Sequence, residues 1–152
     1  MRNRMLNFDY STNNLYFVTS CTKDKIYYFG EIDNNKMILN AMGEIAYQQW
    51  DWLINQYSYI NSHAFVVMPN HIHGVLEINS KNAVNVKIKS LSELMGAYKT
   101  TTSKKIHLLG NNNFAWQRSF HDHIIRTVNA YENIINYIIN NPSQWNKKKK
   151  KK

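Results

Sequence analysis

The chain has 152 residues, of which 43% are hydrophobic, so it is long enough for one domain with a packed core and short for two. It has no run of about 18 apolar residues, which excludes a membrane-spanning helix, and we recognise no secretory signal in its first residues. Its single cysteine, Cys21, excludes an internal disulfide and zinc sites built on paired cysteines. We therefore expect a cytoplasmic protein that does not contact a membrane.

The formal net charge is +9, and its distribution along the chain decides what it means. Six of the 19 basic residues form the run 147–152, so the body of the chain holds 13 basic against 10 acidic residues. A block of like charges is typically disordered and solvated, and it can also bind phosphate. We expect one folded domain over residues 1–146 and a disordered lysine tail over 147–152.

The first part of the chain predicts a strand, a hairpin and a helix. Residues 14–21 are rich in aromatic and β-branched side chains, which favours a strand. Two further stretches, 25–32 and 36–40, flank Asp33-Asn34-Asn35, a typical hairpin turn. Asn40 then suits the N-cap of a helix with one buried face. The apolar residues of that face are Met42, Ile45, Ala46, Trp50, Leu53 and Tyr57.

The middle of the chain predicts two strands and a second helix. Residues 64–68 and 71–78 are separated by Pro69-Asn70, which breaks a strand and lets the next one return alongside. Ser90 and Glu93 have the spacing of a capping box, so we expect a helix to begin there.

The last part predicts one more strand and a third helix. The strand lies within 114–126, and Thr127 opens the helix, which Pro142 is expected to end. Helices separated by mostly antiparallel strands indicate an α+β fold with helices packed against a sheet.

The pair His71 and His73 is the sharpest chemical feature of the sequence. Residues two apart on a strand point to the same side, so both imidazoles should lie on one face while Ile72 faces the other. Two imidazoles on one face can hold a divalent metal ion. A bare His-x-His pair is common, but here the core face of the strand is already supplied by other residues, which are Ile72, Leu76 and Ile78.

The third predicted helix carries a second candidate feature. Tyr137 and Asn141 lie one turn apart at the polar flank of the helix, where they would supply a nucleophile and a metal ligand. The helix segment by itself favours the simpler interpretation, a boundary tyrosine and an Asn-Pro helix end. Its predicted apolar arc consists of Val128, Tyr131, Ile135, Ile138 and Ile139.

Five segments in this order resemble the single-tyrosine transposases whose active site contains a histidine-hydrophobic-histidine (HUH) pair, and most closely the REP-associated tyrosine transposases. They are CTKDKIYYFGEIDNNKMILNAMGEIA, AFVVMPNHIHGVLEI, LMGAYKTTTSKKI, WQRSFHDHIIR and YENIINYIINNPSQW, and the resemblance extends from about Leu15 to Trp145. It implies a ferredoxin-like or RRM-like antiparallel sheet with helices packed on it, of the HUH endonuclease type.

The resemblance also implies a function and its residues. His71 and His73 match the HUH pair, Tyr137 matches the nucleophile, and Asn141 stands where insertion-sequence members have glutamine, as third ligand. The implied enzyme is a transposase that nicks and rejoins hairpin-containing single-stranded DNA through a 5′-phosphotyrosine, with Mg²⁺ or Mn²⁺ as cofactor. Amide and imidazole ligands leave positions open on such an ion for a phosphate oxygen.

Basic residues near the predicted site are candidate DNA contacts. They are Arg118, Arg126 and Lys99, whose charges suit phosphate groups, although a solvated surface is the more common explanation for a lysine. A homodimer stays open, because insertion-sequence relatives exchange the tyrosine helix between subunits whereas the REP-associated type can work as a monomer.

Two functions of other classes remain compatible with the sequence. One is an RRM-like module that binds nucleic acid without cutting it. The other is a metal-dependent phosphodiesterase that uses water, with Tyr137 only structural.

Overall fold

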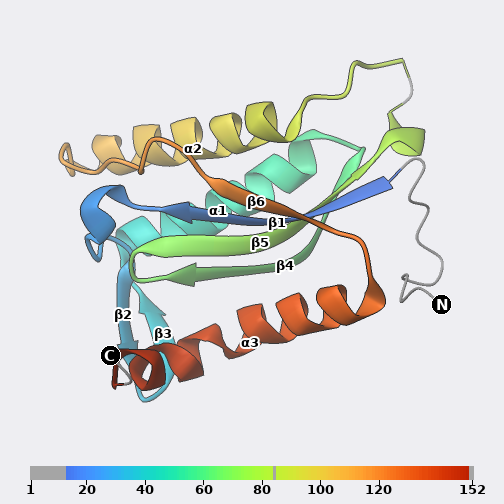
Figure 1. Cartoon of the computed structure of the whole chain (residues 1–152). Helices are drawn as coiled ribbons and strands as arrows, with labels where there is room; N and C mark the ends of the chain where they lie inside the picture. The colour runs from blue at the N-terminus through green and yellow to red at the C-terminus, as the bar shows by residue number, and fades with distance from the viewer. Residues whose placement is uncertain (1–12, 84, 151–152) are drawn as a thin grey trace.

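A four-stranded antiparallel sheet is the centre of the computed structural model, which describes residues 13–83 and 85–150 (Figure 1). Its strands lie in the order β4-β5-β1-β6. This order, with one helix after the first strand and another before the last, is that of the ferredoxin-like fold. The predicted α+β class is confirmed. The strands are β1 (Asn13–Cys21), β4 (Ile60–Met68), β5 (His71–Asn79) and β6 (His121–Ile125).

The hairpin of β2 (Gly30–Asp33) and β3 (Lys36–Leu39) forms a separate two-stranded sheet. Its turn residues, Asn34 and Asn35, have φ of 51° and 63°, the left-handed conformation that a two-residue hairpin loop requires and that asparagine tolerates. The strand predicted over 25–32 begins only at Gly30. A 3-10 turn, η1 (Lys23–Lys25), precedes it, and a second one, η2 (Ser80–Asn82), follows β5.

The predicted helix starts are confirmed by their capping contacts. The Asn40 side chain accepts a hydrogen bond from the Gly43 amide at 2.9 Å and opens α1 (Ala41–Gln56). Ser90 and Glu93 form the reciprocal capping box of α2 (Leu91–Leu108). These side chains satisfy backbone N–H groups that have no partner within the helix.

The sheet separates two apolar cores. Helices α1 and α2 cover one face, where Ile72, Leu76 and Ile78 of β5 join the larger core, and α3 (Val128–Lys150) lies along the other face (Figure 1). The smaller core beneath α3 consists of Leu15, Val75, Ile125 and Ile138. Among the described residues, no helix is both long and apolar enough to traverse a bilayer.

Helix α3 differs from its prediction in three ways. It does not end at Pro142, which lies inside it, because the residues that follow still pack against the sheet end through Trp145. The backbone of residues 147–150 is helical, where a disordered tail was expected, and 151–152 lie outside the described residues. Ile139, assigned to the apolar arc, is 67% exposed, whereas Ile134 packs into the smaller core.

Candidate functional site

Strand β5 presents both candidate histidines to the face covered by α3. His71 and His73 have ring centroids 4.6 Å apart, and His73 is only 6% exposed. Ile72, between them, is fully buried in the core on the opposite face. The alternation predicted from the sequence is confirmed.

Each imidazole is oriented through its Nδ1 atom. His71 Nδ1 lies 2.6 Å from the Asn70 side-chain oxygen, and His73 Nδ1 lies 2.7 Å from Thr19 Oγ1. A carbonyl oxygen only accepts, so His71 Nδ1 donates and the ring lone pair is on Nε2. The Thr19 hydroxyl permits the same tautomer for His73. Metal-binding histidines are oriented in this way by partners outside the coordination sphere.

Helix α3 brings its own polar residues to the histidines. The Tyr137 ring centroid lies 5.4 Å from that of His73, and the Trp145 ring stacks on His71 at 6.0 Å with an interplanar angle of 30°. Asn141 is one turn from each of these helix residues, so the three form one stripe along α3. Asn141 therefore lies between the two helix side chains that contact the histidines.

Asn141 has the properties of a side chain that needs a polar partner. It is 3% exposed, and its Nδ2 atom is buried without a hydrogen bond among the described residues. Leaving such a group unsatisfied costs about 1–3 kcal/mol. Rotation of the amide exchanges nitrogen and oxygen, which would turn Oδ1 toward the same position. Two imidazoles and this amide oxygen suit a divalent cation. The described part of the chain has no group of three His, Cys, Asp or Glu side chains that could hold a metal ion, so any such site here must include a ligand of another type.

Tyr137 lies at the boundary between the core and the solvent. Its ring meets Phe17 edge to face, with centroids 6.2 Å apart and an interplanar angle of 85°. The residue is 40% exposed, so a large substrate can reach it. The structure thus brings together His71, His73 and Tyr137, and it places Asn141 one helical turn from Tyr137 on the same stripe of α3.

The three predicted DNA contacts have different environments. Arg118 is exposed. It lies at the end of the sheet where β1 ends, as shown by the adjacent Gln117 amide, which donates to Cys21 O at 2.8 Å. Arg126 is exposed at the opposite end, just beyond the Ile125–Leu15 pair. Lys99 is partly buried, which lowers its pKa, and its Nζ donates to the carbonyl oxygens of Gln117 (2.8 Å) and Arg118 (3.4 Å).

A basic groove surrounds Arg118. It consists of a cavity of about 820 Å³ along α2 and one of about 620 Å³ beside η1, which share residues 115–118. The second cavity and the histidine pair lie at the same end of the sheet, since Thr22, which precedes the lining residue Lys23, donates its amide to Asn70 O at 2.9 Å. The basic residues that line this groove are Lys23, Lys25, Lys99, Lys104 and Arg118.

Sequence reasoning missed several residues of the site. Asn70 was interpreted only as a strand breaker, and Thr19 only as part of a strand. Thr19 carried no local signal, because its contact with His73 depends on the β1–β5 register that pairs the two residues. Trp145 was hidden because the helix was expected to end before it.

The chain is similar in sequence to one known protein over most of its length. No family model matches the chain. Over 157 residues it is 31% identical to an uncharacterized protein of Haemophilus influenzae, with 93% of this chain and 87% of that protein covered. The chain belongs to the family of this protein.

Two solved structures share the fold. A REP-associated tyrosine transposase bound to a REP hairpin superimposes with a TM-score of 0.63 and 18% identity, over 92% of this chain and 73% of that one. A "putative transposase" from Deinococcus radiodurans superimposes with a TM-score of 0.54 and 14% identity, over 90% and 95%. The chain therefore has the fold of these two proteins.

Proposed function

We propose that the chain is a single-tyrosine transposase that cuts and rejoins hairpin-containing single-stranded DNA through a 5′-phosphotyrosine. The observation that carries this proposal is the approach of the Tyr137 and His73 rings to 5.4 Å, on the face that also holds His71 and Asn141. A weak nucleophile such as a phenol needs an adjacent base or a metal ion to activate it, and the oriented imidazole pair is suited to hold such an ion. One catalytic domain over residues 1–146 would contain the whole site.

His71, His73 and Asn141 would hold Mg²⁺ or Mn²⁺. The fit rests on the two Nδ1 contacts, which direct the Nε2 lone pairs, and on the buried amide of Asn141 that lacks a hydrogen bond. When bound, the ion would polarise a phosphate oxygen and offset the charge that develops on it.

Tyr137 would perform the covalent step. Its phenolic oxygen, after losing its proton, attacks the scissile phosphorus and forms a phosphotyrosyl bond. The bond from phosphorus to the 3′ oxygen breaks, and that oxygen takes a proton to become a free 3′-OH. Attack by another 3′-OH reverses the step and rejoins a strand. One phosphate ester replaces another, so no ATP is consumed.

The basic groove around Arg118 would bind the DNA. Its cations lie at the same end of the sheet as His71, so a bound strand can extend from the groove toward Tyr137. Arg126 would contact phosphates farther from the groove. Lys99 would have two roles, since its Nζ holds the backbone of residues 117–118 in place and its charge can also contact DNA. The structural relative bound to a REP hairpin supports a DNA partner. Since Tyr137 meets a histidine of its own chain, the proposed site needs no second subunit.

Covalent capture tests the proposal. The protein is incubated with 5′- and 3′-labelled hairpin DNA and Mn²⁺, and adducts that resist denaturation are resolved by electrophoresis. We expect an adduct with the wild type and none with Tyr137→Phe, because only the phenolic oxygen can form the link. His71→Ala and His73→Ala should also abolish it. Tyr47→Phe is the matched control, since this tyrosine is 48% exposed and lies on α1.

The same experiment separates the competing functions. Cleavage by Tyr137→Phe at the wild-type rate would identify water as the nucleophile and favour a phosphodiesterase. Binding without cleavage by any form would favour a nucleic-acid-binding module.

A further inference from the structure

We infer that Glu77, His63 and Tyr131 form a hydrogen-bonded latch that fixes the rotation of α3 and thereby positions Tyr137 against His73. This inference rests on the proposed function, for which Tyr137 is the nucleophile. The three residues come from β5, β4 and α3, and none of them belongs to the proposed metal site.

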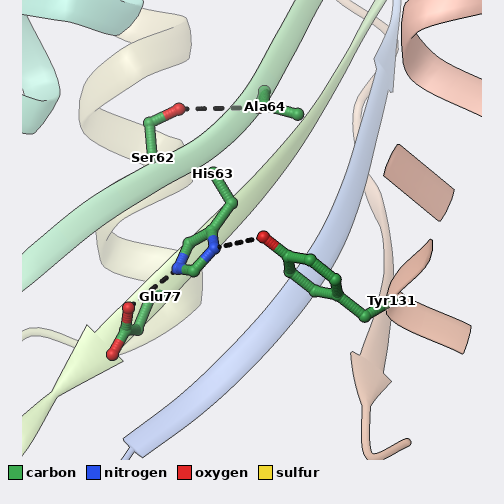
Figure 2. A network of polar contacts seen from close by, with 5 residues as sticks. All are labelled: Ser62, His63, Ala64, Glu77 and Tyr131. Atoms are coloured by element: carbon green, nitrogen blue, oxygen red, sulfur yellow. Dashed lines mark hydrogen bonds and ion pairs between the residues drawn. The ribbon is translucent and has the colours of Figure 1, made fainter. Parts of the chain in front are cut away.

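The latch is a continuous chain of two short hydrogen bonds (Figure 2). His63 Nε2 lies 2.8 Å from Glu77 Oε1, and His63 Nδ1 lies 2.8 Å from the Tyr131 hydroxyl oxygen. The His63 and Glu77 side chains are 22% and 13% exposed, which limits competition from water. The His63 imidazole thus connects the sheet to the helix.

A β-bulge puts His63 on the face of α3. The pairing of β4 with β5 shifts between Ser62 and Ala64, so that His63 is the extra residue. Ser62 bonds to Trp50 of α1 on one face, whereas Ala64 packs into the core beneath α3 on the other. An inserted residue re-aims a side chain in this way, and bulges are frequent beside functional sites.

The latch and the proposed metal site lie at opposite ends of one row. Along β5, the side chains facing α3 are His71, His73, Val75 and Glu77, because residues two apart share a face. Helix α3 runs over this row with Tyr131 at the Glu77 end and Tyr137 at His73. Six residues separate the two tyrosines, or about 9 Å along the helix axis.

Directional contacts set the rotation of α3 more closely than aliphatic packing does. The smaller core consists of aliphatic side chains, whose contacts have no preferred direction. A rotation of about 20° would move a side-chain atom about 6 Å from the helix axis by about 2 Å. Displacements of about 1 Å can cost about 100-fold in rate. The latch supplies such a contact through two hydrogen bonds at the Glu77 end of the row, as the Trp145–His71 stacking does at the other end.

Tyr131 acts through its neutral hydroxyl. Burial and then the nearby Glu77 carboxylate raise the pKa of this phenol, so it stays protonated and hydrogen-bonded. These conditions are unfavourable for a second nucleophile. Tyr131 is therefore a positioning residue, although the sequence had indicated only an apolar arc residue.

The test compares Tyr131→Phe, His63→Ala and His63→Gln with the wild type. Glutamine can donate to Glu77 and accept from Tyr131, so it should restore what alanine removes. Tyr98→Phe is the matched control, because it removes a tyrosine hydrogen bond to Ala46 O (2.8 Å) on the other face of the sheet. Two readouts are taken: the single-turnover rate of adduct formation at saturating DNA and Mn²⁺, and the ¹⁹F signal of 3-fluorotyrosine incorporated at position 137.

We expect Tyr131→Phe and His63→Ala to shift the ¹⁹F signal and slow adduct formation by about 10- to 100-fold, with unchanged DNA affinity. His63→Gln and Tyr98→Phe should leave both readouts near wild type. A ¹⁹F signal in Tyr131→Phe identical to that of the wild type would overturn the latch. If the wild type forms no adduct, the proposed function fails, and the ¹⁹F signal still decides whether the latch positions Tyr137.

Discussion

Replacing Thr19 with valine should weaken divalent-metal binding without removing a proposed ligand. Valine has nearly the shape of threonine and lacks only the hydroxyl, which lies 2.7 Å from His73 Nδ1. The change therefore removes one orienting contact of the imidazole ring without altering Nε2, the proposed ligand atom. It tests whether orientation of the ring, and not only its presence, contributes to affinity.

The expected loss follows from the burial of the pair. Removing such an orienting partner typically costs about 10- to 100-fold in metal affinity, or about 1.4–2.8 kcal/mol. His73 is 6% exposed, so water has little access to replace the hydroxyl. His71 and Asn70 are more exposed, and water can substitute there. We expect Thr19→Val near the upper end of the range and Asn70→Ala near the lower.

Manganese affinity is measured by isothermal titration and by the loss of the free Mn²⁺ signal in electron paramagnetic resonance. Thermal unfolding without metal gives the structural cost separately. Stripping His73 Nδ1 of its partner should destabilise the fold by about 1–3 kcal/mol, which at this chain length lowers Tm by about 2–12 °C.

Thr101→Val is the matched control. It also removes a threonine hydroxyl, which donates to Tyr98 O at 3.2 Å on α2, far from the histidines. Its manganese affinity should equal that of the wild type. If Thr19→Val and Thr101→Val bound manganese equally well, the reasoning from ring orientation would be refuted.

Two further predictions concern the fold. Gly74→Ala should lower the free energy of unfolding, measured in urea, by about 1–3 kcal/mol, because its Cβ would lie 2.7 Å from Cη2 of the Trp50 ring, which is stacked on Phe65. Gly96 in α2 has open space around it, so Gly96→Ala should instead raise the free energy of unfolding by about 0.5–1 kcal/mol. Burial raises the pKa of the Tyr98 phenol above its ordinary value of 10.0. The buried neutral phenol therefore contributes its full stability below pH 10.0, and this contribution is lost as the pH rises above 10.0, because the phenol then ionises in the unfolded chain but not in the folded one. The urea concentration at the unfolding midpoint should decrease between about pH 9 and about pH 11, and the decrease should be smaller in Tyr98→Phe. An equal decrease in the wild type and the variant would contradict this prediction.

Local signals in the sequence were sufficient for most of the fold. The asparagine pair of the hairpin, the Asn40 cap and the Ser90–Glu93 capping box each act within a few residues, and each is found where it was predicted. The alternation of β5 likewise determined which face His71 and His73 occupy. These features depend on chemistry that adjacent residues carry by themselves.

Features that depend on distant partners could not be predicted. Pro142 is a helix breaker by local rules. Trp145, however, contacts His71 and Tyr27 only if α3 continues beyond Pro142. His63 carried no signal because its role requires a bulge in β4 and a tyrosine 68 residues later in the chain. Lys99 looked like a phosphate contact until two backbone carbonyl oxygens were found at its ammonium group.

Helix α3 is attached to the sheet by contacts of two kinds, and the difference between them bears on how such a site works. The aliphatic core around Val75 and Ile138 supplies most of the adhesion and would tolerate small rotations. The polar and aromatic contacts at the two ends, Tyr131 with His63 and Trp145 with His71, fix the orientation. Tyr137 lies between these ends, and its position therefore depends on these two contacts as well as on its own edge-to-face contact with Phe17.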